Sequence, residues 1–117
     1  MVKLIRTPQR VPVPGGKVID EYVGRVSTGT DGVSVARMKA PPGWDEPAQT
    51  PQFDEVTLVL AGRLVVEHDD TRTEVAAGEA VLTPAGQTVR YVAGSDGAEY
   101  VAVCVPAFAP ELAGRED

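Results

Sequence analysis

The chain has 117 residues, of which 43% are hydrophobic and 24% are charged. A chain of this length forms one domain of ordinary size and buries a core without disulfides. The formal net charge of -6 argues against a nucleic-acid partner, because a surface that binds phosphates needs a dense basic patch. Cys104 is the only cysteine, so an intramolecular disulfide is excluded.

The N-terminal segment, residues 1–17, is expected to be an extended arm. Its prolines, Pro8, Pro12 and Pro14, are incompatible with a helix or a central strand, so we expect it along a sheet edge or on a neighbouring subunit. The segment lacks the hydrophobic region of a signal peptide, and the chain has no apolar run of roughly 18 residues. We therefore expect a cytoplasmic protein with no membrane partner.

Residues 18–105 read as a series of short strands. Twelve glycines and ten prolines separate segments rich in Val, Ile and Thr, a pattern typical of strands joined by tight turns. The predicted strands, in chain order, are 18–26, 33–39, 55–60, 63–68, 73–76, 80–83, 88–93 and 98–105. We therefore predict a sandwich or a closed barrel, because a single sheet of this size would leave its edges open. Residues 106–117 form a surface tail with Phe108 as its anchor.

Regularly spaced glycines, prolines and one acid mark the middle of the chain. The first group consists of Gly43, Gln49-Thr50-Pro51, Glu55 and Gly62. The second consists of Gly78, Pro84, Gly86 and Val89. The spacing resembles the two motifs of the cupin superfamily. The resemblance implies an all-β fold, a single antiparallel, jelly-roll-like cupin β-barrel over residues 1–117, and pairing into a homodimer through sheet edges.

In the family that the spacing resembles, four motif positions hold a divalent metal inside the barrel. This sequence places at them Gln49, Pro51 (Thr50 under the longer spacing), Glu55 and Val89. Only Glu55 is a good ligand, because proline and valine have no donor atom and a glutamine carbonyl binds transition metals weakly. The single histidine, His68, is interpreted as part of a solvated hairpin turn. We therefore predict no metal and no cofactor.

Glu55 is the candidate catalytic residue. If it points inward as the resemblance implies, burial raises the pKa of its carboxyl group and makes it a candidate general acid or base. The equally weighted alternative is a structural carboxylate hydrogen-bonded to Gln49, Thr57 or Arg37. Gln49 either orients a ligand through its amide or bonds the loop backbone.

The other candidate substrate-binding residues are Arg37, Trp44, Phe53 and Tyr91. Arg37 depends on which face of the strand 33–39 is interior, which the alternation leaves open. Tyr91 follows Val89 inward if Val89 takes the former histidine position. Trp44 and Phe53 are expected near a mouth of the barrel, where each either stacks on a ligand or plugs the end.

Three functions that use the pocket remain open at this stage, and so does a protein whose pocket is filled by side chains and which acts through its surface. The first is a metal-independent cupin that binds a small organic molecule and uses Glu55 for proton transfer in isomerisation, cyclisation or elimination. The second is a non-catalytic binding or sensor module with the same pocket. The third is a metal-dependent cupin dioxygenase or isomerase with atypical ligands, which the lost ligand positions disfavour.

Overall fold

The computed structural model describes residues 1–116 and is almost entirely β. Asp117, the last residue of the predicted tail, lies outside the described residues. The elements, in chain order, are β1 (Gln9–Val11), β2 (Val18–Val23), β3 (Ser34–Ala40), β4 (Asp54–His68), β5 (Thr71–Ala76), β6 (Ala80–Thr83), β7 (Arg90–Val105) and the helix α1 (Pro110–Ala113). The all-β prediction is confirmed. No helix in residues 1–116 is long and apolar enough to cross a membrane.

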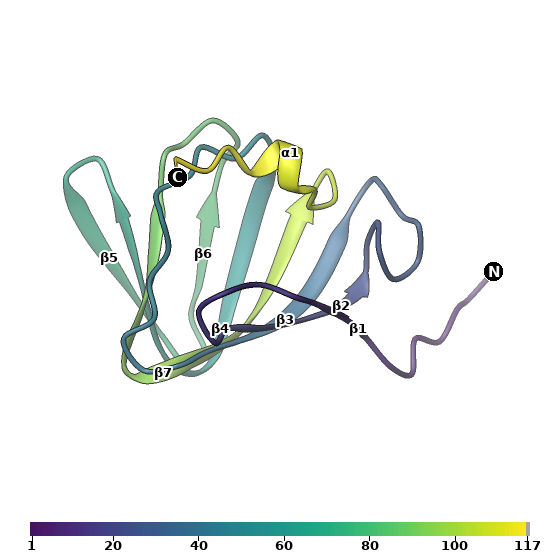
Figure 1. Ribbon diagram of the computed structural model, residues 1–117, viewed down its shortest axis with the longest axis horizontal. Helices are drawn as coiled ribbons and strands as arrows, with labels where there is room; N and C mark the ends of the chain where they lie inside the picture. Colours follow the sequence, from purple (N-terminus) through teal and green to yellow (C-terminus); the bar gives the residue numbers. More distant parts are fainter. Residues whose placement is uncertain (117) are drawn as a thin grey trace.

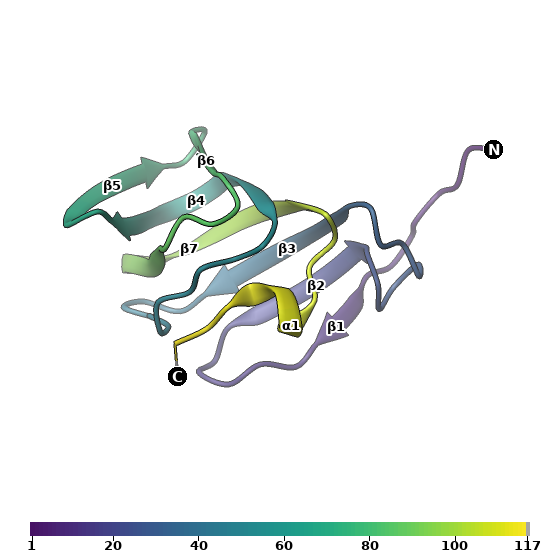
Figure 2. The same cartoon turned by 90° about the horizontal axis from the view of Figure 1, so that it is seen from above.

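The strands form one antiparallel sheet that bends back on itself in a jelly-roll-like arrangement. Its order is β1-β2-β3-β7-β4-β5, and β6 pairs separately with β4. The first half of β4 pairs with β6 and its second half with β5, while β7 accompanies β4 over both halves. Figures 1 and 2 show the long strands turning from one layer into the other. The prolines of the arm leave β1 at the sheet edge, as predicted.

Two of the turns predicted from the sequence are wrong. Residues 61–62 and 94–97 were expected to end strands, yet β4 and β7 run through them with shifts in register. Gly62 has φ +75°, and a Cβ on it would lie 2.2 Å from the carbonyl oxygen of Gly97. Glycine lets two backbones approach this closely without breaking the ladder, so four predicted strands become two bent ones.

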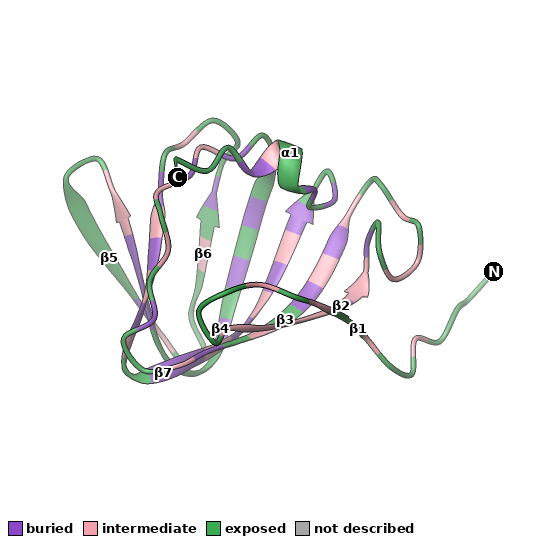
Figure 3. Cartoon of the chain, in the orientation of Figure 1, coloured by how far each residue is buried: buried purple, intermediate pink, exposed green. Residues whose placement is uncertain are grey.

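Strict alternation along the first half of β4 separates the interior from the outer face. Residues 55, 57 and 59 are buried, whereas 56, 58 and 60 are exposed, and Figure 3 shows the two colours alternating along the strand. The buried apolar cluster contains Ala40, Trp44, Val59, Leu64, Val66, Val75, Val89, Tyr91, Ala93, Ala98 and Tyr100. On β3 the register places residues 34, 36, 38 and 40 inside, which settles the face left open by the sequence.

Two irregular segments cover one side of the interior. The connection between β3 and β4 runs beside β7, joined by the backbone bridges Asp45–Val92 and Gln49–Val89 (Figure 1). The C-terminal tail then pairs with that connection, since the amide of Thr50 donates to the carbonyl of Gly114. Phe108 makes an edge contact with Phe53 at 5.9 Å between ring centroids, in agreement with its predicted anchoring role.

Candidate functional site

Glu55 lies inside the fold in a polar row that crosses the sheet. Its neighbours in register are Thr83 on β6 and Cys104 on β7, and Cys104 in turn pairs with Ser34 on β3. Glu55 is only 9% exposed, and the hydroxyl of Thr57 donates to its Oε2 at 3.2 Å. The sequence suggested Gln49, Thr57 or Arg37 as its partner, and the structure selects Thr57.

The environment holds the Glu55 carboxyl group near the midpoint of its titration at neutral pH. Burial raises the pKa of Glu55 to about 7, because a charged carboxylate loses its hydration there. Lys17 and the hydrogen bond from Thr57 oppose this rise, and the negative charge of Glu46 adds to it. Such a group both accepts and returns a proton at physiological pH.

Lys17 supplies a cation inside the fold that the sequence analysis missed. It precedes β2, and its Nζ lies 4.3 Å from the ring centroid of Trp44 and 5.5 Å from that of Tyr100. An ammonium group over aromatic faces is stabilised by the ring quadrupoles. Burial lowers the pKa of Lys17, and the nearby carboxylates Glu46 and Glu55 oppose that change. The sequence did contain one signal for this position: side chains alternate along a strand, so Lys17 lies on the same face as Ile19 and Glu21.

A second carboxyl group, Glu46, completes the charged part of the site. Burial raises its pKa, while the positive charges of Lys17, Arg115 and Arg90 lower it. Arg115 reaches this region because the C-terminal tail forms a bridge with Gln49. Glu46 and Arg115 lie in segments whose pairing no local pattern predicts, so the sequence analysis did not find them.

Two buried tyrosines add neutral hydroxyl groups. The Tyr91 hydroxyl lies 3.2 Å from that of Thr83, and burial raises the pKa of Tyr91 far above its usual range. Burial likewise raises the pKa of Tyr100. Burial also raises the pKa of the Cys104 thiol to about 12, which keeps it protonated and unsuited to nucleophilic attack. Both tyrosine hydroxyl groups therefore stay protonated and can donate a hydrogen bond.

The structure separates the predicted substrate-binding residues into two groups. Gln49, Trp44 and Tyr91 are buried with Glu55 on the interior side. Arg37 is excluded from the interior, because it projects from the outer face of β3 and pairs with Glu99.

Phe53 does not border an open mouth of the fold. It is 2% exposed and packs against Phe108 of the tail. Its aromatic ring thus secures the end of the fold, which is the plugging alternative considered from the sequence.

The motif positions do not fit a transition metal. Gln49 and Val89 exchange both backbone hydrogen bonds, and the Val89 side chain is part of the apolar cluster. Pro51 is buried and carries no donor atom, which leaves Glu55 as the one carboxylate among the four positions. Within the described residues, no group of three or more His, Cys, Asp and Glu side chains is arranged to hold a metal ion.

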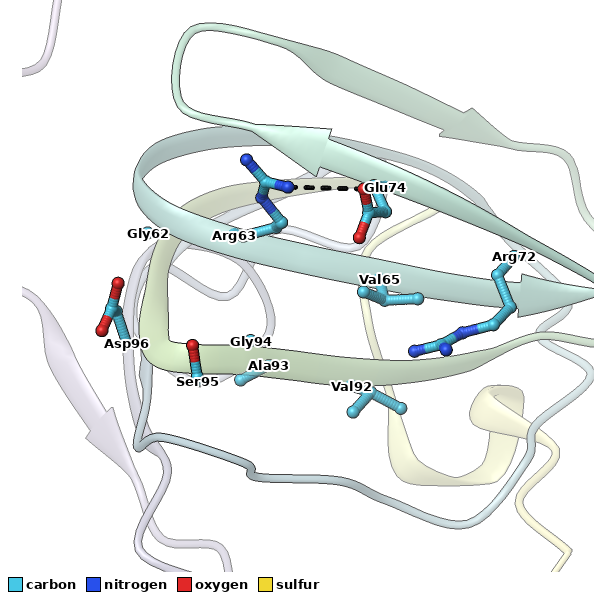
Figure 4. A pocket seen from close by; sticks show the side chains of 10 residues that line it. All are labelled: Gly62, Arg63, Val65, Arg72, Glu74, Val92, Ala93, Gly94, Ser95 and Asp96. Carbon is cyan, nitrogen blue, oxygen red and sulfur yellow. Dashed lines mark hydrogen bonds and ion pairs between the residues drawn. The ribbon is translucent and has the colours of Figure 1, made fainter.

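A surface depression lies outside this site. A groove of about 450 Å³ follows the outer side of the bend in β4 and β7, and Figure 4 shows the Arg63–Glu74 ion pair across part of it. Its lining includes Arg72, Ser95 and Asp96. All three are exposed, so solvent screens the charges of Arg72 and Asp96.

Comparison with known proteins identifies the family. The sequence matches the Cupin domain family over residues 36–106, which is more than half of the chain. The chain belongs to the cupin family. The match covers most of β3 and all of β4 to β7, including Glu55 and both glycine-bounded motifs, so the resemblance drawn from spacing is confirmed.

Several known proteins resemble this cupin. The endoribonuclease YbeY of Myxococcus xanthus is 50% identical over 113 residues, which cover 96% of this chain but 38% of that protein. The polyketide cyclase RemF of Streptomyces resistomycificus has a TM-score of 0.76 at 20% identity, covering 97% of this chain and 85% of that one. KdgF from Halomonas has a TM-score of 0.73 at 17% identity, covering 89% and 91%. These structural likenesses show the fold.

Proposed function

We propose that this cupin binds a small enolisable carbonyl compound inside the fold and moves a proton on it, with Glu55 as the acid and base. The observation that carries the proposal is the burial of Glu55, whose pKa is raised to about 7. Lys17, Tyr91 and Tyr100 lie near enough for their charge or their titration to be coupled to that of Glu55. Likeness to a polyketide cyclase is compatible with carbonyl chemistry on this fold.

The proton transfer needs no metal at the motif positions. Glu55 in its ionised form takes a proton from the carbon beside the carbonyl group, so that a C–H bond breaks and the carboxyl O–H forms. The electron pair moves to the carbonyl oxygen, where Lys17 and a tyrosine hydroxyl stabilise the enolate. Glu55 then returns the proton to another carbon or to the oxygen, which completes an isomerisation and restores the carboxylate.

The test measures exchange of carbon-bound hydrogen with D2O. The probes are cyclic ketones and α-hydroxy ketones, whose hydrogens beside the carbonyl exchange slowly without a catalyst, and NMR follows their loss. We expect the protein to accelerate exchange of at least one probe and Glu55→Gln to lower the rate about 100-fold or more, the usual scale of a general base. Glutamine keeps the shape of the side chain and removes its titration.

Asp96→Asn is the matched control, since it also neutralises an acid but lies exposed at the bend of β7. Its exchange rate should equal that of the unmodified protein. Equal rates for Glu55→Gln and the unmodified protein would reject the catalytic role. Ligand-induced thermal stabilisation without exchange would instead support the non-catalytic binding or sensor function.

The charge distribution favours a small molecule over RNA as the ligand. The endoribonuclease name belongs to a relative of which this chain matches 38%, and the net charge here is -6. Five arginines are paired with carboxylates, in Arg10–Asp20, Arg37–Glu99, Arg63–Glu74, Arg72–Glu67 and Arg90–Asp45. Pairing of this kind leaves little positive potential to neutralise phosphates.

A further inference from the structure

The turn before β2 directs the Lys17 side chain into the fold. Gly15 and Gly16 both have a positive φ, +86° and +79°, which glycine adopts without strain. The register then pairs Ile19 with Met38, which lies on the inner face of β3. Lys17 precedes Ile19 by two residues and so shares its face. The backbone of this turn therefore places an amine among interior side chains.

Aromatic rings, in place of a close carboxylate, surround the Lys17 amine. Its Nζ lies 4.3 Å from the ring centroid of Trp44 and 5.5 Å from that of Tyr100, and both rings are buried. None of the ion pairs formed among residues 1–116 includes Lys17. Burial lowers the pKa of Lys17, and the positive charge of Arg115 adds to this effect. A desolvated lysine of this kind loses its proton more readily and becomes a nucleophile.

An acid that can supply and accept protons lies near this amine. Lys17 and Glu55 are close enough for the charge of each to shift the pKa of the other. The pKa of Glu55 is raised to about 7, so both forms of its carboxyl group are populated at neutral pH. Imine formation uses both forms, because the acid protonates the departing oxygen and the carboxylate accepts the proton that nitrogen loses.

We propose that the Lys17 amine forms an imine with the carbonyl compound bound in the fold, and that the imine nitrogen takes the electron pair when the proton moves. The inference rests on the proposed function, because it needs a carbonyl ligand beside Glu55. Lys17 then acts through a covalent bond instead of through its charge alone. The ligand class narrows to aldehydes and ketones, since esters, amides and carboxylic acids do not form imines with an amine in water.

Glu55 supplies the one proton that imine formation consumes. The nitrogen lone pair forms the C–N bond, the C=O pair moves to oxygen, and Glu55 protonates that oxygen and then takes a proton from nitrogen. Glu55 next protonates the hydroxyl group, which leaves as water as the C=N bond forms. The carboxylate now removes a proton from the neighbouring carbon, and the electron pair moves to nitrogen to give an enamine. Return of the proton and addition of water release the product and restore the amine.

The first experiment traps the imine by reduction in the unmodified protein. Hydroxyacetone or cyclohexanone is added with sodium cyanoborohydride, whose hydride converts an imine into a stable secondary amine. Peptide mass spectrometry then locates an adduct with the mass of the probe less one oxygen atom. The chain has two other lysines, Lys3 and Lys39, and both are exposed. We expect Lys17 to be labelled about 10-fold or more faster than either, because a bound carbonyl is held beside its amine.

Lys17→Arg separates covalent from electrostatic action, because arginine keeps the positive charge but does not form this imine. We expect the variant to lose the label and to slow exchange of the probes with D2O about 10-fold or more. Lys39→Arg is the matched control, since Lys39 is exposed on the outer side of β3. It should leave both labelling and exchange unchanged.

The outcomes distinguish this inference from the proposed function. Labelling of Lys17 no faster than that of Lys39, or full exchange in Lys17→Arg, would overturn the imine and leave proton transfer by Glu55 intact. A Lys17 adduct together with unchanged exchange in Glu55→Gln would reject the role of Glu55 and leave the imine standing. The trapping result comes from the unmodified protein, so it decides the matter even if Lys17→Arg does not fold.

Discussion

The Glu55 carboxyl group makes the stability of this protein depend on pH in an unusual direction. Its folded pKa of about 7 lies above the ordinary value of 4.5, so between these pH values the folded state binds a proton that the unfolded chain has released. Raising pH through this window therefore lowers the free energy of unfolding. A salt-bridged acid, whose pKa is depressed, has the reverse effect.

Glu55→Gln should remove this dependence. Relative to the unmodified protein, the variant is expected to gain up to about 3 kcal/mol in free energy of unfolding between pH 4.5 and pH 8, since one pKa unit corresponds to about 1.4 kcal/mol. Urea unfolding across this pH range measures the difference. Parallel stability curves for the two proteins would contradict the raised pKa of Glu55, and Asp96→Asn again serves as the exposed control.

Lys17 acts on Glu55 through its charge, which a second substitution isolates. Lys17→Met keeps a straight side chain over Trp44 but removes the ammonium group that lowers the pKa of Glu55. The pKa of Glu55, followed by carboxyl ¹³C NMR, should rise by about one unit. Lys17→Arg retains the charge and should leave the pKa near 7, and a shift in both variants would indicate a packing effect instead.

At the scale of elements, the bend of β4 determines how the two layers face each other. The sequence analysis interpreted the glycines at residues 61–62 and 94–97 as strand-ending turns. Glycine alone does not distinguish the two cases, because a positive φ is common to turns and to bulges. The distinction depends on whether the strand continues to pair beyond the glycine, which is a property of β7 on the other side of the ladder. Local sequence contains no information on that pairing.

Gly62→Ala tests the close approach at the bend. A Cβ at Gly62 meets the Gly97 carbonyl oxygen at 2.2 Å, so we expect a loss of about 3 kcal/mol or more in free energy of unfolding. Gly29→Ala is the matched control, because Gly29 also has a positive φ, +68°, but nothing lies within 4 Å of its Cβ. It should lose about 1 kcal/mol from the left-handed backbone alone. Equal losses in chemical denaturation would show that the contact is unimportant.

At the scale of the whole molecule, the family motifs survive without their metal ligands. The glycines and Glu55 keep the positions that shape the fold, while Val89 has joined the apolar cluster. The donor set therefore predicts that purified protein contains far less than one transition-metal atom per chain, as elemental analysis would measure. One tightly held zinc, iron, nickel or manganese ion per chain would contradict this prediction.

The sequence by itself determined the all-β class, the cupin resemblance and the central position of Glu55, because turn residues and motif spacing are local features that survive in a single chain. Only the tertiary structure decided that Arg37 faces outward and that Lys17, Glu46 and Arg115 bring charge toward Glu55. Lys17, Glu46 and Arg115 come from the arm, the connection between β3 and β4, and the C-terminal tail. Their meeting depends on pairing between segments far apart in the chain, and the register of that pairing decides which side chains share the interior.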